Sequence, residues 1–131
     1  MALDISTSVI DDEKEVVVRL YKKFTNTTNE SALKVIDVSA LASNIAGDAC
    51  SEVSITKIDA IISGVTVELL FDATANTSAI KLAADGDHDY SYFGGLENDA
   101  GAGKTGDVLL TTTGAASGDF FNLIVHADKV F

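Results

Sequence analysis

The chain has 131 residues, 47% of them hydrophobic and 22% charged, which is the composition of a single globular domain and excludes a mainly disordered chain. Its formal net charge of -11 disfavours nucleic acid and anionic membrane surfaces as partners, because both are negatively charged. Cys50 is the one cysteine, which excludes an intrachain disulfide. The sequence also lacks a secretory signal and a membrane-spanning apolar run, so we expect a soluble product made in the cytoplasm.

The first residues are expected to form an N-terminal arm, 1–13, ahead of a single β-sandwich domain, 14–131. Four apolar side chains stand among polar ones in this arm, and it would become ordered only against a partner. A frayed terminus is the alternative explanation. The apolar residues of the arm are Leu3, Ile5, Val9 and Ile10.

Alternation of apolar and polar residues predicts a first strand over residues 14–24. Val16, Val18 and Leu20 would lie on one of its faces, and the run of valines favours a strand over a helix. After a polar loop, residues 32–38 are expected to form the second strand of a pair with the first.

Two β-hairpins are predicted in the rest of the chain. Residues 52–62 and 65–72 are β-rich runs on either side of a short Ser-Gly connection. Residues 107–113 and 119–130 flank a GAASG turn in the same way.

The remaining segments are shorter or less regular. Residues 40–51 predict a short helical turn that ends near Gly47, and residues 79–83 predict a short strand. Residues 84–106 are glycine-rich with embedded aromatic residues, which is typical of a loop. About eight short strands and few helical stretches indicate an all-β fold, either an antiparallel β-sandwich or a jelly-roll-like barrel.

A GKT sequence in the glycine-rich loop has the ending of a phosphate-binding loop. Such a loop needs a glycine where Asn98 stands, and it needs a helix after the lysine, whereas Asp107 is followed by a β run. We therefore interpret residues 101–106 as a glycine-rich connection.

Alternating aspartates in the sequence DGDHD have the spacing that begins a calcium loop. Asp85, Asp87 and Asp89 could meet at a cation, but Tyr90 and Leu96 stand where that loop needs glycine and glutamate. A solvated acidic turn is the preferred interpretation, and the cation site is left open.

Catalytic and metal-binding patterns are otherwise missing from the sequence. His88 and His126 have no second ligand at a metal-binding spacing, and Cys50 lies in no nucleophile motif. We expect a protein that is not an enzyme and that has no cofactor or metal.

Residues 65–118 resemble a group of small structural proteins of tailed-phage virions. The resemblance lies in VELLFDAT (67–74) and FGGLENDAGAGKTGDVLLTTTGAASGD (93–119), followed by an alternating strand. A further short segment of resemblance, DVSAL (37–41), lies earlier in the chain. It implies a β-sandwich displayed in many copies on a virion. This chain departs from the pattern by its acidic loop residues Glu97 and Asp99 and by its longer N-terminal arm.

The resemblance leads us to expect a capsid decoration (cement) protein on the capsid surface. It would bind the major capsid protein as a homo-oligomer, with a trimer favoured. Its contact residues would be those of the N-terminal arm together with Tyr90, Tyr92 and Phe93. A tail or head-tail connector protein is one alternative. The other is a carbohydrate-binding module in which these three aromatic residues stack on sugar and the DGDHD aspartates hold calcium.

Overall fold

The computed structural model describes residues 3–131 and contains, in that part of the chain, nine strands and two short 3-10 turns. The elements are β1 (Ile5–Asp11), β2 (Glu15–Lys23), β3 (Leu33–Ile36), η1 (Val38–Ala40), β4 (Glu52–Ser63), β5 (Thr66–Phe71), β6 (Thr77–Leu82), β7 (Gly86–Asp89), η2 (Ser91–Phe93), β8 (Val108–Thr113) and β9 (Phe120–Val130). The strand pairs are antiparallel.

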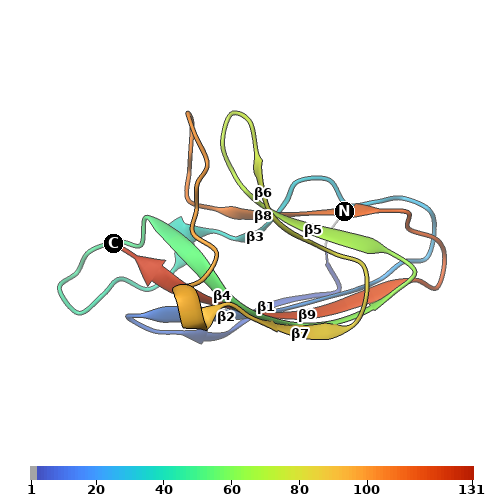
Figure 1. Cartoon of the computed structure of the whole chain (residues 1–131), viewed down its shortest axis with the longest axis horizontal. Helices are drawn as coiled ribbons and strands as arrows, with labels where there is room; N and C mark the ends of the chain where they lie inside the picture. The colour runs from blue at the N-terminus through green and yellow to red at the C-terminus, as the bar shows by residue number, and fades with distance from the viewer. Residues whose placement is uncertain (1–2) are drawn as a thin grey trace.

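The strands form two sheets that face each other as the two layers of a sandwich (Figure 1). The five-stranded sheet has the order β1-β2-β9-β4-β7, and the four-stranded sheet has the order β3-β8-β5-β6. The pairs β2–β9, β3–β8, β4–β7 and β5–β6 are nested, as in one long hairpin whose tip is the β5–β6 connection. Additional pairing of β9 with β4 and of β8 with β5 rolls this hairpin into a jelly roll. The predicted all-β sandwich is confirmed.

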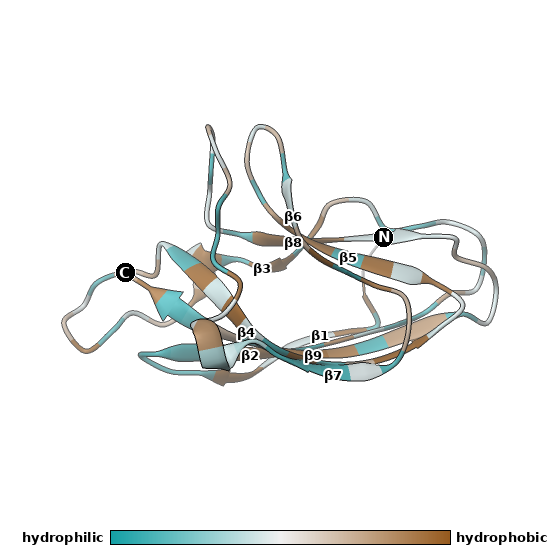
Figure 2. Cartoon of the chain, viewed as in Figure 1, coloured by the Kyte–Doolittle hydropathy of each residue, from teal (hydrophilic) through white to brown (hydrophobic). Residues whose placement is uncertain are grey.

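Apolar side chains on alternate residues of each strand build the core between the sheets. In β2, Val16 and Leu20 are fully buried while Arg19 between them is exposed, and in β9 Phe121 and Leu123 are fully buried. Figure 2 shows this alternation of polar and apolar residues along strands of both layers. Period-two burial of this kind is what a sheet needs when one face meets a partner sheet and the other meets solvent.

One ion pair is enclosed in the interior beside this core. Lys22 extends the buried face of β2, and its Nζ lies 2.7 Å from Oε1 of Glu30, with both side chains 4% exposed. The same ammonium group lies 5.3 Å from the ring centre of Phe24. The backbone N–H of Glu30 also donates a hydrogen bond to Oγ1 of Thr112 in the other sheet. These contacts fix the loop that crosses from β2 to β3.

Both predicted hairpins are wrong in their pairing, although their strands are present. β4 and β5 belong to different sheets, and so do β8 and β9. Alternation determines which face of a strand is buried but not which strand lies beside it. Gly64, at φ +80°, carries the chain from one sheet to the other, and a Cβ there would lie 2.2 Å from Oδ1 of Asp119 in the second crossing. The two crossings therefore pack against each other.

Three local predictions also need correction. β3 pairs with β8 of the opposite sheet, not with β2. The helical turn expected in residues 40–51 lies earlier, as η1, where the Asp37 carboxylate accepts a hydrogen bond from the backbone N–H of Ser39. The segment 84–106 contains β7 and η2, which the glycine and aspartate content of the sequence concealed.

The N-terminal segment lies in the sheet of its own chain. Residues Ile5–Asp11 form β1, which pairs antiparallel with β2 and has a bulge between Ser8 and Ile10. The structure thus differs from the expectation of an arm that is ordered only by a partner. The physical reason is that β2 offers a long edge, and a hairpin after Asp12 satisfies backbone groups of both strands.

Candidate interaction surfaces

The three aromatic residues singled out in the glycine-rich loop lie together. Tyr90 follows β7, and Tyr92 and Phe93 belong to η2. The Tyr92 and Phe93 rings meet edge to face at 4.8 Å, and the Tyr90 and Phe93 ring centres are 6.0 Å apart. Tyr92 is 84% exposed and Phe93 is 53% exposed, whereas burial raises the pKa of the half-buried Tyr90 phenol. The cluster therefore presents two large apolar side chains to solvent.

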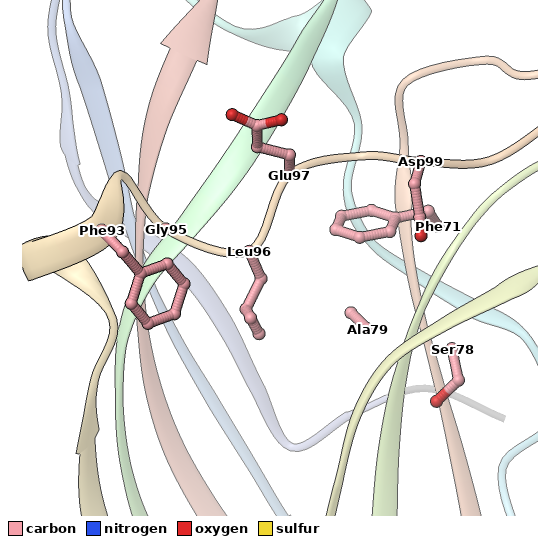
Figure 3. A pocket seen from close by; sticks show the side chains of 8 residues that line it. All are labelled: Phe71, Ser78, Ala79, Phe93, Gly95, Leu96, Glu97 and Asp99. Carbon is pink, nitrogen blue, oxygen red and sulfur yellow. The ribbon is translucent and has the colours of Figure 1, made fainter.

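A pocket of about 440 Å³ opens beside this cluster, between the residues after η2 and the edge strand β6 (Figure 3). Phe93 and Leu96 line one side of it, and Ser78 and Ala79 of β6 line the other. The remaining lining residues are Phe71, Gly95, Glu97 and Asp99. The pocket thus combines an apolar floor with carboxylates and a hydroxyl near its rim.

Backbone hydrogen bonds hold the aromatic cluster against the five-stranded sheet. Ile55 and Leu96 exchange reciprocal N–H···O bonds of 3.0 and 2.7 Å. Gly95 has a φ of +92°, and a Cβ there would lie 2.9 Å from the carbonyl oxygen of Ile55, so only glycine permits this approach. The pocket wall is consequently part of the fold and not a free loop.

The three aspartates of DGDHD are not placed to share a metal ion. Oδ1 of Asp85 accepts a 2.7 Å bond from the N–H of Ile62. Asp87 lies opposite Asp59 in the β4–β7 pair. Asp89 accepts bonds from the hydroxyl and the N–H of Ser91, which lower the pKa of its carboxyl. Within residues 3–131, no three or more acidic, histidine or cysteine side chains are placed to share a metal ion.

The GKT segment has structural contacts. Nζ of Lys104 lies 2.9 Å from Oε1 of Glu52, and the Thr105 hydroxyl donates to the carboxylate of Asp72 at 2.8 Å. A Cβ at Gly103 would lie 2.2 Å from Oγ1 of Thr74. These contacts dock residues 101–106 onto the start of β4 and onto the loop after β5.

The histidines and the cysteine are not brought together. His88 stacks in parallel on Tyr90 with ring centres 6.4 Å apart, and His126 Nε2 lies 4.0 Å from an oxygen of Asp59. Cys50 is buried, and burial raises the pKa of its thiol. A buried thiol of this kind is a poor nucleophile.

The apolar residues predicted as contacts in the N-terminal segment have different environments. Leu3 and Ile5 are half-buried, and Leu3 packs against the core. Val9, at the bulge, is 60% exposed, and Ile10 is 41% exposed. Only the second half of β1 therefore presents apolar side chains to solvent.

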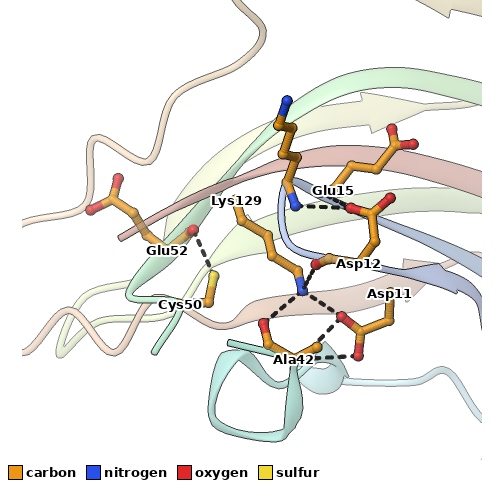
Figure 4. Close-up of polar contacts among 8 residues, drawn as sticks. Asp11, Asp12, Glu15, Ala42, Cys50, Glu52 and Lys129 are labelled. Atoms are coloured by element: carbon orange, nitrogen blue, oxygen red, sulfur yellow. Dashed lines mark hydrogen bonds and ion pairs between the residues drawn. The ribbon is translucent and has the colours of Figure 1, made fainter. Parts of the chain in front are cut away.

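A buried lysine of β9 fastens β1 in place. The Nζ of Lys129 donates to the carboxylate of Asp11, to the carbonyl oxygen of Asp12 and to that of Ala42 (Figure 4). The Asp11 carboxylate in turn accepts from the N–H of Ala42 at 3.1 Å. The Asp12 carboxylate caps the following turn, and bonds from the backbone N–H groups of Lys14 and Glu15 lower its pKa.

A second hollow, of about 350 Å³, lies between β1 and β2 on one side and the β3–η1 segment on the other. The small side chains Ser6 and Ser8 line it from β1. Its other lining residues are Val18, Lys34, Val35, Ile36, Asp37, Ala40 and Leu41. The hollow exists because the five-stranded sheet has β1 as one strand more than the sheet beneath it.

The sequence did not single out four further exposed apolar residues, which are Ile45, Ile61, Val130 and Phe131. Ile45 is 93% exposed in the turn from Asn44 to Gly47, and Ile61 is half exposed on the outer face of β4. The exposure of Ile45 could have been expected from its position among polar residues in a turn. The exposure of Ile61 could not, because it depends on whether another part of the chain covers the outer face of β4.

The two predicted contact regions lie at opposite edges of the five-stranded sheet. β1, with Val9 and Ile10, is one edge strand, and β7, which leads into Tyr92 and Phe93, is the other. Four strand spacings separate the two edges, which is about 19 Å.

Searches against protein-family models and curated proteins found no match to this chain. In residues 3–131 there is no helix of the length and apolar character required to cross a membrane.

Proposed function

We propose that this protein is a structural virion component that decorates a capsid and stabilises the shell of the major capsid protein. The observation that supports this role best is the placement of exposed apolar side chains at opposite edges of one sheet. A protein with contact regions on two sides can touch two neighbours at once. The resemblance of residues 65–118 to tailed-phage structural proteins supplies the identity of those neighbours.

In this proposal the protein acts by binding alone and not by catalysis. Each contact would bury roughly 800 Å² per partner, and many modest contacts on one shell add up through multivalency. The acidic surface keeps free copies apart in solution before assembly. A homo-oligomer, with a trimer favoured, would multiply the contacts of each particle-binding unit.

Co-sedimentation with empty phage heads tests the proposal, together with light scattering of the protein alone. Deleting residues 1–12 would remove a strand of the sheet, so point variants are the better probes. We expect V9S/I10S to reduce saturable binding to heads, because it removes apolar contact area at β1. The control is Ile61→Ser, a position of similar exposure on the interior strand β4 of the same sheet.

The same experiment addresses the tail or connector alternative. Self-assembly into rings or tubes without binding to heads would replace the capsid proposal with a tail role. Binding that is unaffected by V9S/I10S would remove β1 from the contact surface.

A second candidate function, carbohydrate binding, is favoured by the pocket beside the aromatic cluster. The Tyr92 and Phe93 rings can stack on the apolar face of a sugar, and carboxylates at the rim can accept hydrogen bonds from its hydroxyls. Because no three acidic side chains in residues 3–131 are placed to share a metal ion, we expect such binding not to need calcium. Calorimetry with neutral oligosaccharides should then give binding that survives a chelator and is lost in Y92A and F93A. The absence of any such binding would eliminate this function.

A further inference from the structure

We infer that the outer edge of β1 is a docking site for an extended segment of another protein, which adds to the five-stranded sheet as a further strand. The segment would have uncharged, β-branched residues at its centre and basic residues at both ends. This inference concerns the chemistry of the segment, and it does not depend on whether the partner belongs to a capsid.

Among the four edge strands of the sandwich, β1 is the least protected. Natural edge strands avoid unwanted pairing by being short or charged, or by a bulge, and in β1 the bulge at Val9 leaves Ile5 to Ser8 regular. β3 has four residues and carries Lys34, β7 has four residues with the sequence GDHD, and β6 carries the exposed Lys81. β1 has seven residues, and its one charged residue, Asp11, is paired with Lys129.

The unpaired edge of β1 offers backbone groups along an uncharged stretch. From Ile5 to Ser8 the ladder with β2 is regular, and the bulge at Val9 interrupts it before pairing resumes at Ile10. An edge strand leaves about half of its N–H and C=O groups directed away from its neighbour, where another strand can pair with them. In residues 3–131 no other strand lies on that side of β1.

The hollow beneath β1 gives the added strand a place for a side chain. Ser6 and Ser8 are too small to fill the space above Val35 and Leu41. A strand paired with β1 would extend the overhang of the five-stranded sheet, and an apolar side chain on its inner face would cover this hollow. Burial of that side chain adds an apolar contribution to the backbone hydrogen bonds.

Charge selects the partner and argues against a second copy of the chain. Exposed acids flank the uncharged stretch, with Asp4 at one end and Asp12 and Glu13 at the other. Antiparallel pairing of two β1 strands about Ser8 would place Asp4 of each copy near Asp12 of the other, and the two chains each carry a net charge of -11. A segment with lysine or arginine at both ends complements the same acids.

Amide hydrogen exchange of the full chain tests this inference with a defined probe. The probe is a short peptide of alternating threonine and valine with two lysines at each end, and the control peptide has glutamates in place of the lysines. We expect the lysine peptide to slow exchange of β1 amides roughly tenfold or more at saturation, because they gain hydrogen-bond partners. Exchange at β3, β6 and β7 should be unchanged.

Three variants separate edge pairing from general attraction. Val9→Lys places a lysine on the edge and should abolish protection, whereas Ile61→Lys adds the same charge on the interior strand β4 and should preserve it. D12N/E13Q should weaken peptide binding roughly threefold or more and reduce its dependence on salt.

Three results would each overturn the inference. Equal protection by the glutamate peptide would remove the charge argument, and protection at another edge strand would place the site elsewhere. Protection of β1 that rises with protein concentration without peptide would mean that a second copy is the occupant.

Discussion

Replacement of Lys129 by methionine should destabilise the protein, because it removes the amine that joins β9 to β1. Methionine keeps most of the apolar stem of lysine, so the packing of the side chain is largely preserved. The lost contacts are those of Nζ with the Asp11 carboxylate and with the carbonyl oxygens of Asp12 and Ala42. The Lys129 side chain has no exposed surface, so its ammonium group depends on these acceptors.

The expected loss follows from the number and exposure of the acceptors. A hydrogen bond to a charged group contributes about 1.5–3 kcal/mol, but water replaces part of this at Asp11, whose side chain is 26% exposed. Breaking a buried ion pair from one side typically costs about 3–5 kcal/mol. We expect a decrease of about 3 kcal/mol in the free energy of unfolding, which corresponds to a fall in Tm of about 10–15 °C for a domain of this size.

Thermal and urea unfolding of Lys129→Met measure this change, and Lys14→Met is the matched control because Lys14 is exposed. Hydrogen exchange should also show β1 opening before the rest of the five-stranded sheet in the Lys129 variant. A loss below about 1 kcal/mol, which is the value for an exposed ion pair, would refute the argument that the amine is enclosed.

Three further predictions concern backbone, acid and thiol. Gly106→Ala should cost at least about 2 kcal/mol in urea unfolding, because Gly106 has a φ of +89° and a Cβ there would lie 1.9 Å from the carbonyl oxygen of Ser51; Gly114→Ala, at φ +76° in open space, should cost less. The pKa of Asp12 is lower in the folded protein than in the unfolded chain, so the ionised carboxyl contributes stability above about pH 4, and this stability is lost as the pH falls through the pKa of the folded protein. Asp12→Asn should therefore reduce the decrease in the free energy of unfolding at acid pH. Cys50 should react with a thiol reagent only at the rate of unfolding, and rapid labelling of the native protein would contradict its burial.

The sequence was sufficient for the fold class and for the positions of most strands. Alternation in residues 14–24 and 119–130 located β2 and β9 correctly, because a two-layer sandwich buries one face of each strand. Alternation could not identify the partner of each strand. The short connections at Ser63-Gly64 and in GAASG fit a hairpin as well as they fit a crossing between the two sheets. The crossings at Gly64 and Asp119 depend on contacts between segments far apart in the chain.

The candidate surfaces were predictable in part. The aromatic residues of the glycine-rich loop were identified from their type and do lie together, whereas β7 was missed because glycine and aspartate are poor strand formers. The N-terminal segment carried a weak apolar pattern, and its place in the sheet depends on Lys129, which lies more than a hundred residues away. Such a contact leaves no local signal.

The nested strand order has a consequence for how the molecule is made. β9, formed by Phe120–Val130, lies between β2 and β4 in the five-stranded sheet. Synthesis proceeds at about 5–20 residues per second, so several seconds pass between the synthesis of β2 and that of β9, which pairs with its edge. During that interval the nascent chain exposes an unpaired, valine-rich strand edge. The excess of negative charge on each chain then disfavours premature association between chains on neighbouring ribosomes, because like charges repel.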